Sequence, residues 1–286
     1  MIQFGVRAHD FCPPADIETF AERMKGMGIC HIQLALEKSI TGYDFSCGHY
    51  SAGFAGYLGR ELAKRDLHVA VLGCYINPVN PDENLRLRDV ERFKERLRYA
   101  KHMNADMVGT ETGRYSRDMS VVPGTDSKEC YRILLDSFER IVTEAEALGV
   151  VVGVEGVFDH TLSSPEKMRQ FLKDLASPAV EVILDTANLM SPDTAHNPGL
   201  QNETIQKAFD FYGGRISVLH LKDCVFDAKG VQVCTRPGEG LACYDGLMKQ
   251  VRRQKPHIIG LLEESSPKHY ERDREFFVKQ WERGAI

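Results

Sequence analysis

Four apolar segments in the second half of the chain each end on a side chain that can bind a cation. The segments 150–154, 180–184, 216–219 and 258–262 have strand length and lead directly into Glu155, Asp185, His220 and Glu263. Successive members of this set are 30, 35 and 43 residues apart, which leaves room for one strand and one helix in each interval. Parallel strands joined by helices end on the same face of a sheet or barrel. We therefore expect three carboxylates and one imidazole to converge there.

The same alternation of strand and helix runs through the whole chain. Apolar patterns predict strands at 2–6, 29–36, 68–75, 106–110, 150–155, 181–185, 216–220 and 258–262, and helices at 16–27, 51–65, 85–103, 129–148, 164–175, 202–212, 244–254 and 271–283. Eight such units in 286 residues favour an α/β fold closed into a single (β/α)₈ TIM barrel domain over residues 1–286. No GxGxxG motif follows the first strand, which weakens the alternative of an open, dinucleotide-binding sheet.

Helix-end signals support these boundaries. Asp16 is placed to cap the first helix, and Ser164 with Pro165 has the pattern of a cap followed by proline at the first helical position. Gly149 follows the longest helical pattern as a stop signal. These signals fix the ends of three predicted helices.

Composition excludes several classes of partner. The net charge is −5 and no Lys/Arg-rich block occurs, which argues against nucleic acid. No run approaches the roughly 18 apolar residues of a membrane span, and the amino terminus reads as a strand, so we expect a cytoplasmic protein. The eight cysteines include no CxxC pair, which predicts reduced thiols. A small-molecule partner fits this composition.

The converging set has the chemistry of an open metal site. Two glutamates, one aspartate and one histidine are rich in oxygen ligands and suit one divalent ion; we favour Mn²⁺, with Mg²⁺, Co²⁺ and Zn²⁺ as alternatives. Such an ion could hold two neighbouring oxygens of a sugar and stabilise the enediolate that forms when the carbon-bound proton leaves. Glu155 and Glu263 could then act as acid and base on two faces of one carbon.

In these segments the chain resembles the sugar phosphate isomerase/epimerase superfamily of xylose isomerase-like TIM barrels. This superfamily includes ketose 3-epimerases, inosose dehydratases and apurinic endonucleases. The resemblance covers nearly the whole chain and rests on Val154-Glu155, Leu184-Asp185-Thr186-Ala187-Asn188, His220-Leu221-Lys222-Asp223, Arg236-Pro237-Gly238-Glu239-Gly240 and Leu262-Glu263. It implies a TIM barrel enzyme of carbohydrate metabolism.

The resemblance also assigns roles to residues. It implies Glu155, Asp185, His220 and Glu263 as metal ligands, with the two glutamates doubling as the acid/base pair of the epimerases. Arg236 would hold substrate hydroxyls or a phosphate. Asn188 stands where many members have a histidine, which argues for a single metal ion and makes Asn188 a candidate substrate contact.

Other strand-end residues should face the same mouth. His9, Cys74 and Glu111 lie at the ends of the first, third and fourth strands, and we expect His9 and Glu111 to contact substrate. Lys222 should orient a substrate oxygen or a ligand carboxylate, with a salt bridge to Asp223 or a neighbouring acid as the alternative.

Three further points concern positions near these strand ends. Glu263 and Glu264 are adjacent and only one can point inward; the family pattern favours Glu263. His160 and His49, the latter with Asp44, are interpreted as solvated loop residues. Asp223 itself is interpreted as a structural loop residue.

The sequence thus predicts a metal-dependent isomerase or epimerase that acts on a sugar, sugar phosphate or polyol by proton transfer. A dehydratase of the inosose dehydratase type on the same metal site is one alternative. A non-catalytic sugar-binding barrel is the other. The sequence selects neither the substrate nor the metal, and self-association into a homo-oligomer is left open.

Overall fold

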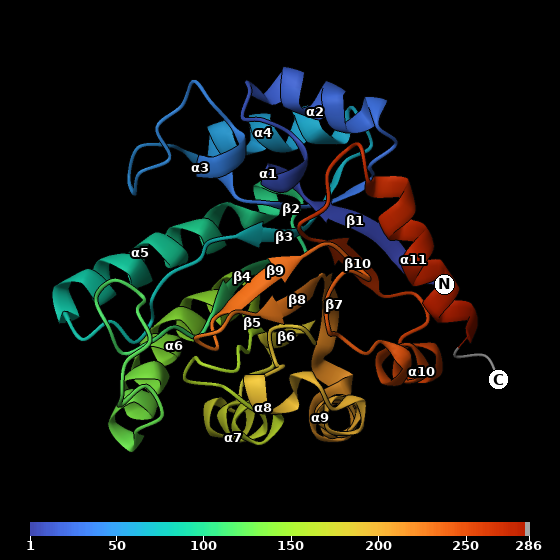
Figure 1. The fold of residues 1–286 in the computed structure, drawn as a ribbon. Helices are drawn as coiled ribbons and strands as arrows, with labels where there is room; N and C mark the ends of the chain where they lie inside the picture. The colour runs from blue at the N-terminus through green and yellow to red at the C-terminus, as the bar shows by residue number, and fades with distance from the viewer. Residues whose placement is uncertain (284–286) are drawn as a thin grey trace.

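A closed barrel of eight parallel strands forms the centre of the molecule (Figure 1). The computed structural model describes residues 1–283. The barrel strands are β1 (Gln3–Arg7), β2 (His31–Leu34), β3 (His68–Gly73), β4 (Met107–Glu111), β5 (Val151–Glu155), β6 (Val180–Asp185), β7 (Ile216–Leu221) and β10 (Ile259–Leu262). They pair in the order β1-β10-β7-β6-β5-β4-β3-β2, and β1 closes the ring on β2. The expected (β/α)₈ TIM barrel is confirmed.

Eight longer helices lie outside the barrel (Figure 1). They are α2 (Ile17–Gly26), α4 (Ala52–Ala63), α5 (Glu83–Ala100), α6 (Lys128–Leu148), α7 (Pro165–Leu175), α9 (Pro198–Tyr212), α10 (Asp245–Gln254) and α11 (Tyr270–Arg283). Asp16 and Ser164 accept backbone hydrogen bonds at the starts of α2 and α7, and Gly149 ends α6 with a left-handed φ of 61°. The three helix-end predictions are therefore confirmed.

The loops between these elements carry short helical turns. They are α1 (Ala8–Phe11), α3 (Leu36–Ser39), α8 (Pro192–Ala195), η1 (Lys101–Met103) and η2 (Gly213–Arg215). None of the helices described combines the length and the apolar composition that a membrane span requires. The short turns α1, α3 and α8 follow β1, β2 and β6, and so lie at the carboxyl ends of barrel strands.

The inside of the barrel is filled by a small apolar cluster. It consists of Ala70, Val71, Met107, Ile183, Val218 and Leu261, with Val151 and Ile259 packed against it. Two glycines make room for Ile183, because a Cβ on Gly109 would lie 2.9 Å from its Cδ1 atom and a Cβ on Gly153 would lie 3.0 Å from it. This packed layer is the floor beneath the carboxyl ends of the strands.

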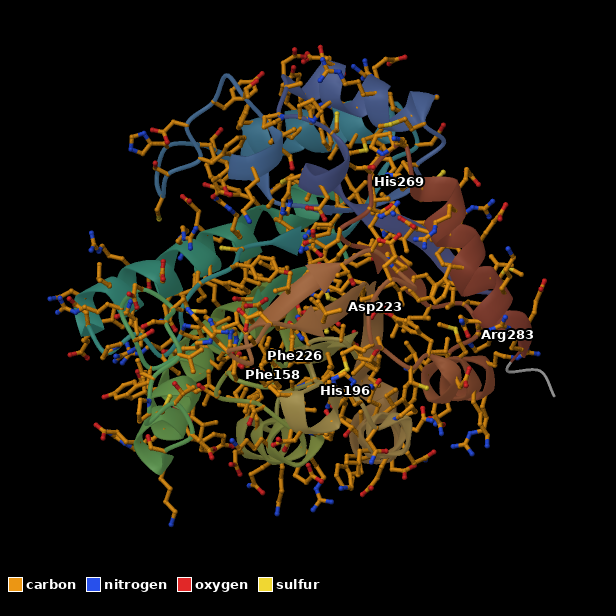
Figure 2. All side chains as sticks on the ribbon, viewed as in Figure 1. Phe158, His196, Asp223, Phe226, His269 and Arg283 are labelled. Carbon is orange, nitrogen blue, oxygen red and sulfur yellow. The ribbon has the colours of Figure 1, made fainter. Side chains whose placement is uncertain are left out.

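A two-stranded antiparallel hairpin interrupts the seventh strand–helix unit and was not expected from the sequence. Its strands are β8 (Asp223–Phe226) and β9 (Gln232–Thr235), and they lie between β7 and α10. Phe226 of β8 packs edge to face against Phe158, which follows β5, with ring centroids 5.7 Å apart (Figure 2). Gln232 donates a hydrogen bond of 2.8 Å to the Ala187 carbonyl after β6. The hairpin is thus held to loops at the barrel mouth.

Candidate metal and sugar site

Strand alternation places the candidate residues in one layer above the barrel floor. In a strand every second side chain points to the same side. On each of five strands the residues two or four positions before a candidate side chain belong to the packed interior of the barrel or are glycines beside it. They are Met107 and Gly109 before Glu111, Val151 and Gly153 before Glu155, Ile183 before Asp185, Val218 before His220, and Ile259 and Leu261 before Glu263. The register continues the layer across strands, because Glu111 pairs with Glu155 and Asp185 pairs with His220. The sequence expectation of convergence therefore holds in the structure.

Glu155, Asp185 and His220 form a buried cluster that could hold a metal ion. One potential ligand atom from each residue lies within 4.8 Å of the others. All three residues are 1% exposed, and Nε2 of His220 has neither a hydrogen-bond nor an ion-pair partner among the described residues. A buried polar atom without a partner is costly, so this ring nitrogen is available as a ligand for a cation. The donor set of two carboxylates and one imidazole suits a hard or borderline divalent ion.

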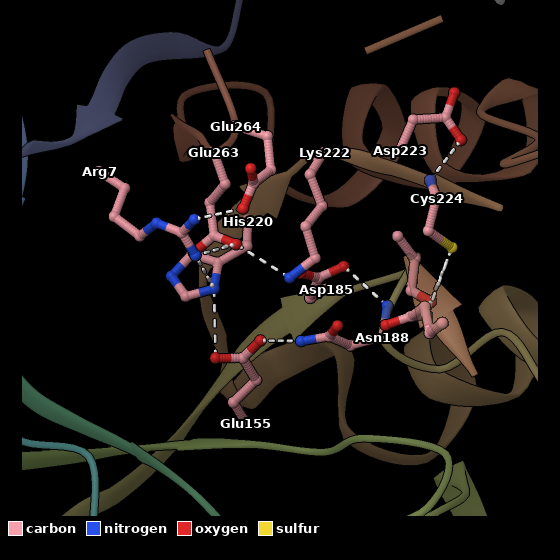
Figure 3. A network of polar contacts seen from close by, with 12 residues as sticks. Arg7, Glu155, Asp185, Asn188, His220, Lys222, Asp223, Cys224, Glu263 and Glu264 are labelled. Atoms are coloured by element: carbon pink, nitrogen blue, oxygen red, sulfur yellow. Dashed lines mark hydrogen bonds and ion pairs between the residues drawn. The ribbon is translucent and has the colours of Figure 1, made fainter. Parts of the chain in front are cut away.

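Glu263 lies beside this cluster rather than within it. Its Oε1 atom is 3.4 Å from Nδ1 of His220, while its Oε2 atom is 3.0 Å from the Arg7 guanidinium and 2.9 Å from the Lys222 ammonium (Figure 3). Burial raises the pKa of Glu263, but Lys222, His220 and Arg7 outweigh it and hold the pKa well below its usual value. Glu263 is therefore an ionised carboxylate with one oxygen directed at the imidazole.

Glu264 points away from the pocket. Its side chain is 39% exposed and pairs with Arg7 at 2.7 Å, whereas that of Glu263 is 2% exposed. The structure thus resolves which of the two adjacent glutamates faces inward, in favour of Glu263.

Lys222 is an internal counterion for the carboxylates. Its ammonium group lies 2.8 Å from Oδ2 of Asp185 as well as 2.9 Å from Glu263. Burial lowers the pKa of Lys222, but Asp185 and Glu263 outweigh this and raise it well above its usual value. The alternative of a salt bridge to a neighbouring acid is confirmed for Asp185 and Glu263. It is wrong for Asp223, which instead accepts backbone hydrogen bonds from Cys224, Gly238 and Ala242. Asp223 has the structural role that was expected, but it begins strand β8 and does not lie in a loop.

The charge on His220 is set by its acidic neighbours. Its Nδ1 atom lies 3.2 Å from Oε2 of Glu155. Burial lowers the pKa of His220, yet the carboxylates of Glu155 and Glu263 outweigh it and raise the pKa to about 9. A metal ion needs the neutral imidazole, so binding a cation here would release a proton.

Asn188 orients Glu155. Its side-chain amide donates a 2.6 Å hydrogen bond to Oε1 of Glu155, and its backbone N–H donates to Oδ1 of Asp185 at 2.9 Å (Figure 3). Burial raises the pKa of Glu155, but His220 and Lys222 outweigh it and leave the pKa below its usual value. Asn188 therefore touches two members of the cluster directly.

A polar cavity of about 250 Å³ opens next to the cluster. Its lining residues are Arg7, His9, Gln33, Lys38, Tyr75, Glu111, Glu155, Lys222 and Glu263. Burial and the neighbouring Glu155 carboxylate raise the pKa of Glu111 to about 7. His9 has a buried Nδ1 atom without a hydrogen-bond partner among the described residues. The volume and the many polar groups suit a small hydroxylated molecule.

Some sequence-predicted residues lie elsewhere. Arg236 is in the loop after the hairpin, pairs with Glu239, and is not part of the cavity lining. Cys74 is buried but does not line the cavity either.

The two loop histidines, His49 and His160, differ in their exposure to solvent. The side chain of His49 is 59% exposed and pairs with Asp44 at 2.9 Å, as expected for a solvated loop. That interpretation is wrong for His160, which is 4% exposed and lies 3.8 Å from Glu111. His160 is buried because the loop after β5 folds back toward β4 instead of extending into solvent, and its backbone N–H bonds to the carbonyl of Val157.

Four cavity residues were missed as site candidates by sequence reasoning: Arg7, Gln33, Lys38 and Tyr75. Gln33 donates a 2.9 Å hydrogen bond to the Tyr75 hydroxyl. Arg7 ends β1. The reasoning that selected Glu155 and His220, that side chains at the carboxyl ends of parallel strands share one face of the barrel, would therefore also have identified Arg7. Gln33 and Tyr75 carried no comparable signal, because a single polar residue within or after an apolar strand does not reveal which side it faces.

Comparisons with known proteins agree with this architecture. The model of a family described as xylose isomerase-like TIM barrel matches residues 22–280. No curated protein matches the chain in sequence.

Three solved structures share the fold at low sequence identity. A 3-keto-D-glucoside 4-epimerase from E. coli is 15% identical with a TM-score of 0.69, covering 98% of this chain and 99% of its own. A D-tagatose 3-epimerase-like protein is 16% identical with a TM-score of 0.72, covering 99% and 98%. An IOLI protein with a bound zinc atom is 15% identical with a TM-score of 0.70, covering 100% and 97%.

Proposed function

The chain belongs to the xylose isomerase-like TIM barrel family, and we propose that it is a divalent-metal-dependent isomerase or epimerase of a sugar, sugar phosphate or polyol. The observation that carries this proposal is the buried cluster of Glu155, Asp185 and His220 beside the ionised carboxylate of Glu263. Two of the similar structures are described as a sugar epimerase and an epimerase-like protein, which supports the same reaction class.

We assign Glu155, Asp185 and His220 as metal ligands and Glu263 as the fourth, through the oxygen nearer to His220. The carboxylate-rich set favours Mn²⁺, with Mg²⁺, Co²⁺ and Zn²⁺ as alternatives. A divalent ion bound here would supply Lewis acidity to neighbouring carbonyl and hydroxyl oxygens of the substrate. His220 must give up its proton for this, and Lys222 already balances part of the carboxylate charge.

Glu155 and Glu263 are the proposed acid/base pair. They end β5 and β10, which are separated in the barrel by β6 and β7, so they reach the cavity from different sides. One carboxylate would take the proton from a carbon next to a carbonyl group, and the other would return a proton to the opposite face. Asn188 holds Glu155 in place and Arg7 holds Glu263, so neither carboxylate has to be repositioned by the substrate.

The remaining cavity residues would bind the substrate. His9, Glu111 and Lys222 line the cavity and offer hydrogen bonds to hydroxyl groups. Asn188 is not among the lining residues and would reach the substrate only beside Glu155, to which it donates a hydrogen bond. Arg236 would contribute only if its loop moved toward the cavity, because its side chain is paired with Glu239.

Proton exchange in deuterated water tests the proposal most directly. The purified protein with Mn²⁺ would be incubated with a panel of ketoses, inososes and sugar phosphates, and deuterium at carbon would be followed by NMR. We expect exchange with at least one substrate, its loss after metal removal, and strong reduction in Glu155→Gln and Glu263→Gln. Glu264→Gln is the matched control, because this side chain points out of the pocket, and it should retain exchange.

The outcomes separate the competing functions. Full exchange in both Glu155→Gln and Glu263→Gln would rule out the proposed roles. Loss of water from the substrate, seen as a new enol absorbance, would identify a dehydratase at the same site. Sugar binding that survives metal removal without any exchange would identify a non-catalytic barrel.

A further inference from the structure

The hairpin over the barrel mouth carries two cysteines directly opposite each other. Cys224 of β8 pairs in register with Cys234 of β9. Near the turn the N–H of Asp227 donates to the carbonyl of Val231, which marks that pair as hydrogen-bonded. Pairs alternate in an antiparallel ladder, so Cys224 and Cys234 form a non-hydrogen-bonded pair, whose Cα atoms are typically about 4.5 Å apart. Disulfides span Cα separations of about 4.4–6.8 Å.

Both thiols lie on the hairpin face that is turned toward the barrel. The Cys224 thiol lies 3.8 Å from the Ala187 carbonyl, to which Gln232 also donates, and the amide nitrogen of Gln232 is 3.3 Å from the Cys224 sulfur (Figure 3). Gln232 and Cys234 are two residues apart on β9 and therefore share this face. The contact with Ala187 places the thiol pair beside the loop that carries Asn188.

The two cysteines differ in their exposure to solvent. Cys224 is fully buried, whereas Cys234 is exposed. Burial raises the pKa of Cys224 to about 12. Burial of the sulfur also raises the pKa of Cys234, but the nearby Lys222 ammonium opposes this. An external reagent therefore meets Cys234 first, with Cys224 as the neighbouring second thiol.

We propose that Cys224 and Cys234 are a reversible modification site, where a small-molecule disulfide oxidant such as oxidised glutathione converts the two thiols into a cross-strand disulfide. The Cys234 thiolate attacks one sulfur of the oxidant, breaks its S–S bond and releases one reduced thiol. The Cys224 thiolate then attacks the Cys234 sulfur of this mixed disulfide and releases the second reduced thiol. The protein loses two protons and two electrons, and the oxidant takes them up as two thiols.

Peptide mapping tests this proposal on the full chain. The native protein would be incubated with oxidised glutathione, its free thiols blocked with N-ethylmaleimide, and the unfolded protein digested with trypsin without reduction. Cleavage after Lys222 and Lys229 separates Cys224, in 223–229, from Cys234, in 230–249, because trypsin does not cut between Arg236 and Pro237. We expect these two peptides to be joined after oxidation and to separate on reduction with dithiothreitol.

Matched variants identify the partners of the link. Cys243 lies in the same peptide as Cys234, so Cys243→Ser should keep the link while Cys234→Ser should abolish it. Cys234 is exposed and its substitution should leave the fold intact, which circular dichroism checks; Cys224→Ser gives the second test. A link that survives in Cys234→Ser, a stable glutathione adduct on Cys234 without the link, or an unmodified pair after prolonged oxidation would each overturn the proposal. None of these readouts depends on the proposed catalytic function.

Discussion

The ammonium group of Lys222 lies 2.8 Å from Oδ2 of Asp185, a residue that also belongs to the candidate metal cluster. The same ammonium lies 2.9 Å from Glu263. The protein therefore carries a fixed positive charge next to the place proposed for a divalent ion. This arrangement opposes the effect of burial on both carboxylates: the pKa of Glu263 falls well below its usual value, whereas burial still leaves that of Asp185 raised.

Replacing Lys222 with methionine should destabilise the metal-free protein. The change keeps most of the side-chain volume but removes the ammonium partner of Asp185 and leaves Glu263 with Arg7 and His220. Breaking a buried ion pair in this way typically costs about 3–5 kcal/mol. Urea denaturation of the metal-free protein measures this cost. Adding Mn²⁺ should recover more stability in the variant than in the parent protein. Lys229→Met on the exposed hairpin turn is the control and should change little; equal stability of the two variants would contradict the role of Lys222.

The stability of the metal-free protein should fall as pH rises from 7 to 9. His220 has a raised pKa of about 9 in the folded state against an ordinary value near 6.5, so its charged form stabilises the fold fully below pH 6.5 and this contribution is lost as pH rises through 9. The total effect is on the order of 3 kcal/mol. Glu111, whose pKa is raised to about 7, is half ionised at pH 7, and its burial lowers stability mainly as pH rises from its ordinary pKa to 7.

Chemical denaturation at a series of pH values after treatment with EDTA measures this dependence. His220→Gln serves as the reference, because the variant lacks the titrating imidazole and should give a flatter profile. Identical profiles for the parent protein and the variant would exclude His220 as the source.

Replacing Asn188 with alanine should weaken metal binding without unfolding the protein. The substitution removes the 2.6 Å hydrogen bond that orients Glu155, and loss of such a supporting contact typically costs about 10–100-fold in metal affinity. Titration calorimetry with Mn²⁺ reads this directly. Asn84→Ala, at an exposed position in α5, is the control. Unchanged affinity in Asn188→Ala would show that Glu155 needs no external positioning.

Gly153→Ala should destabilise the barrel. A Cβ at this position would lie 2.5 Å from Sδ of Met107 and 3.0 Å from Cδ1 of Ile183, so the packed floor must shift. Overpacking of this kind typically costs about 1–3 kcal/mol. Gly26→Ala in α2 is the control, since nothing lies within 4 Å of its added Cβ, and it should be neutral or mildly stabilising. Denaturation midpoints of the two variants separate these outcomes.

The repeated strand-and-helix pattern was sufficient to predict the barrel, because each apolar segment has the length of a strand and each helix carries one apolar face. It also predicted which strand ends carry Glu155, Asp185 and His220. The hairpin was not predicted, because 223–235 mixes polar and apolar residues in a loop position and its fold depends on contacts with Phe158 and Ala187. The pairing of Arg236 with Glu239 likewise depends on loop geometry that spacing alone does not determine.

The packed layer around Ile183 closes the barrel beneath the candidate site. Within the described residues 1–283 this layer fills the barrel axis, so a bound molecule would enter and leave past the loops at the carboxyl ends of the strands. Substrate and product would then pass through the same opening of the cavity. The product of each turnover would have to leave the cavity before the next substrate molecule could enter. The hairpin beside this opening would influence the rate of that exchange.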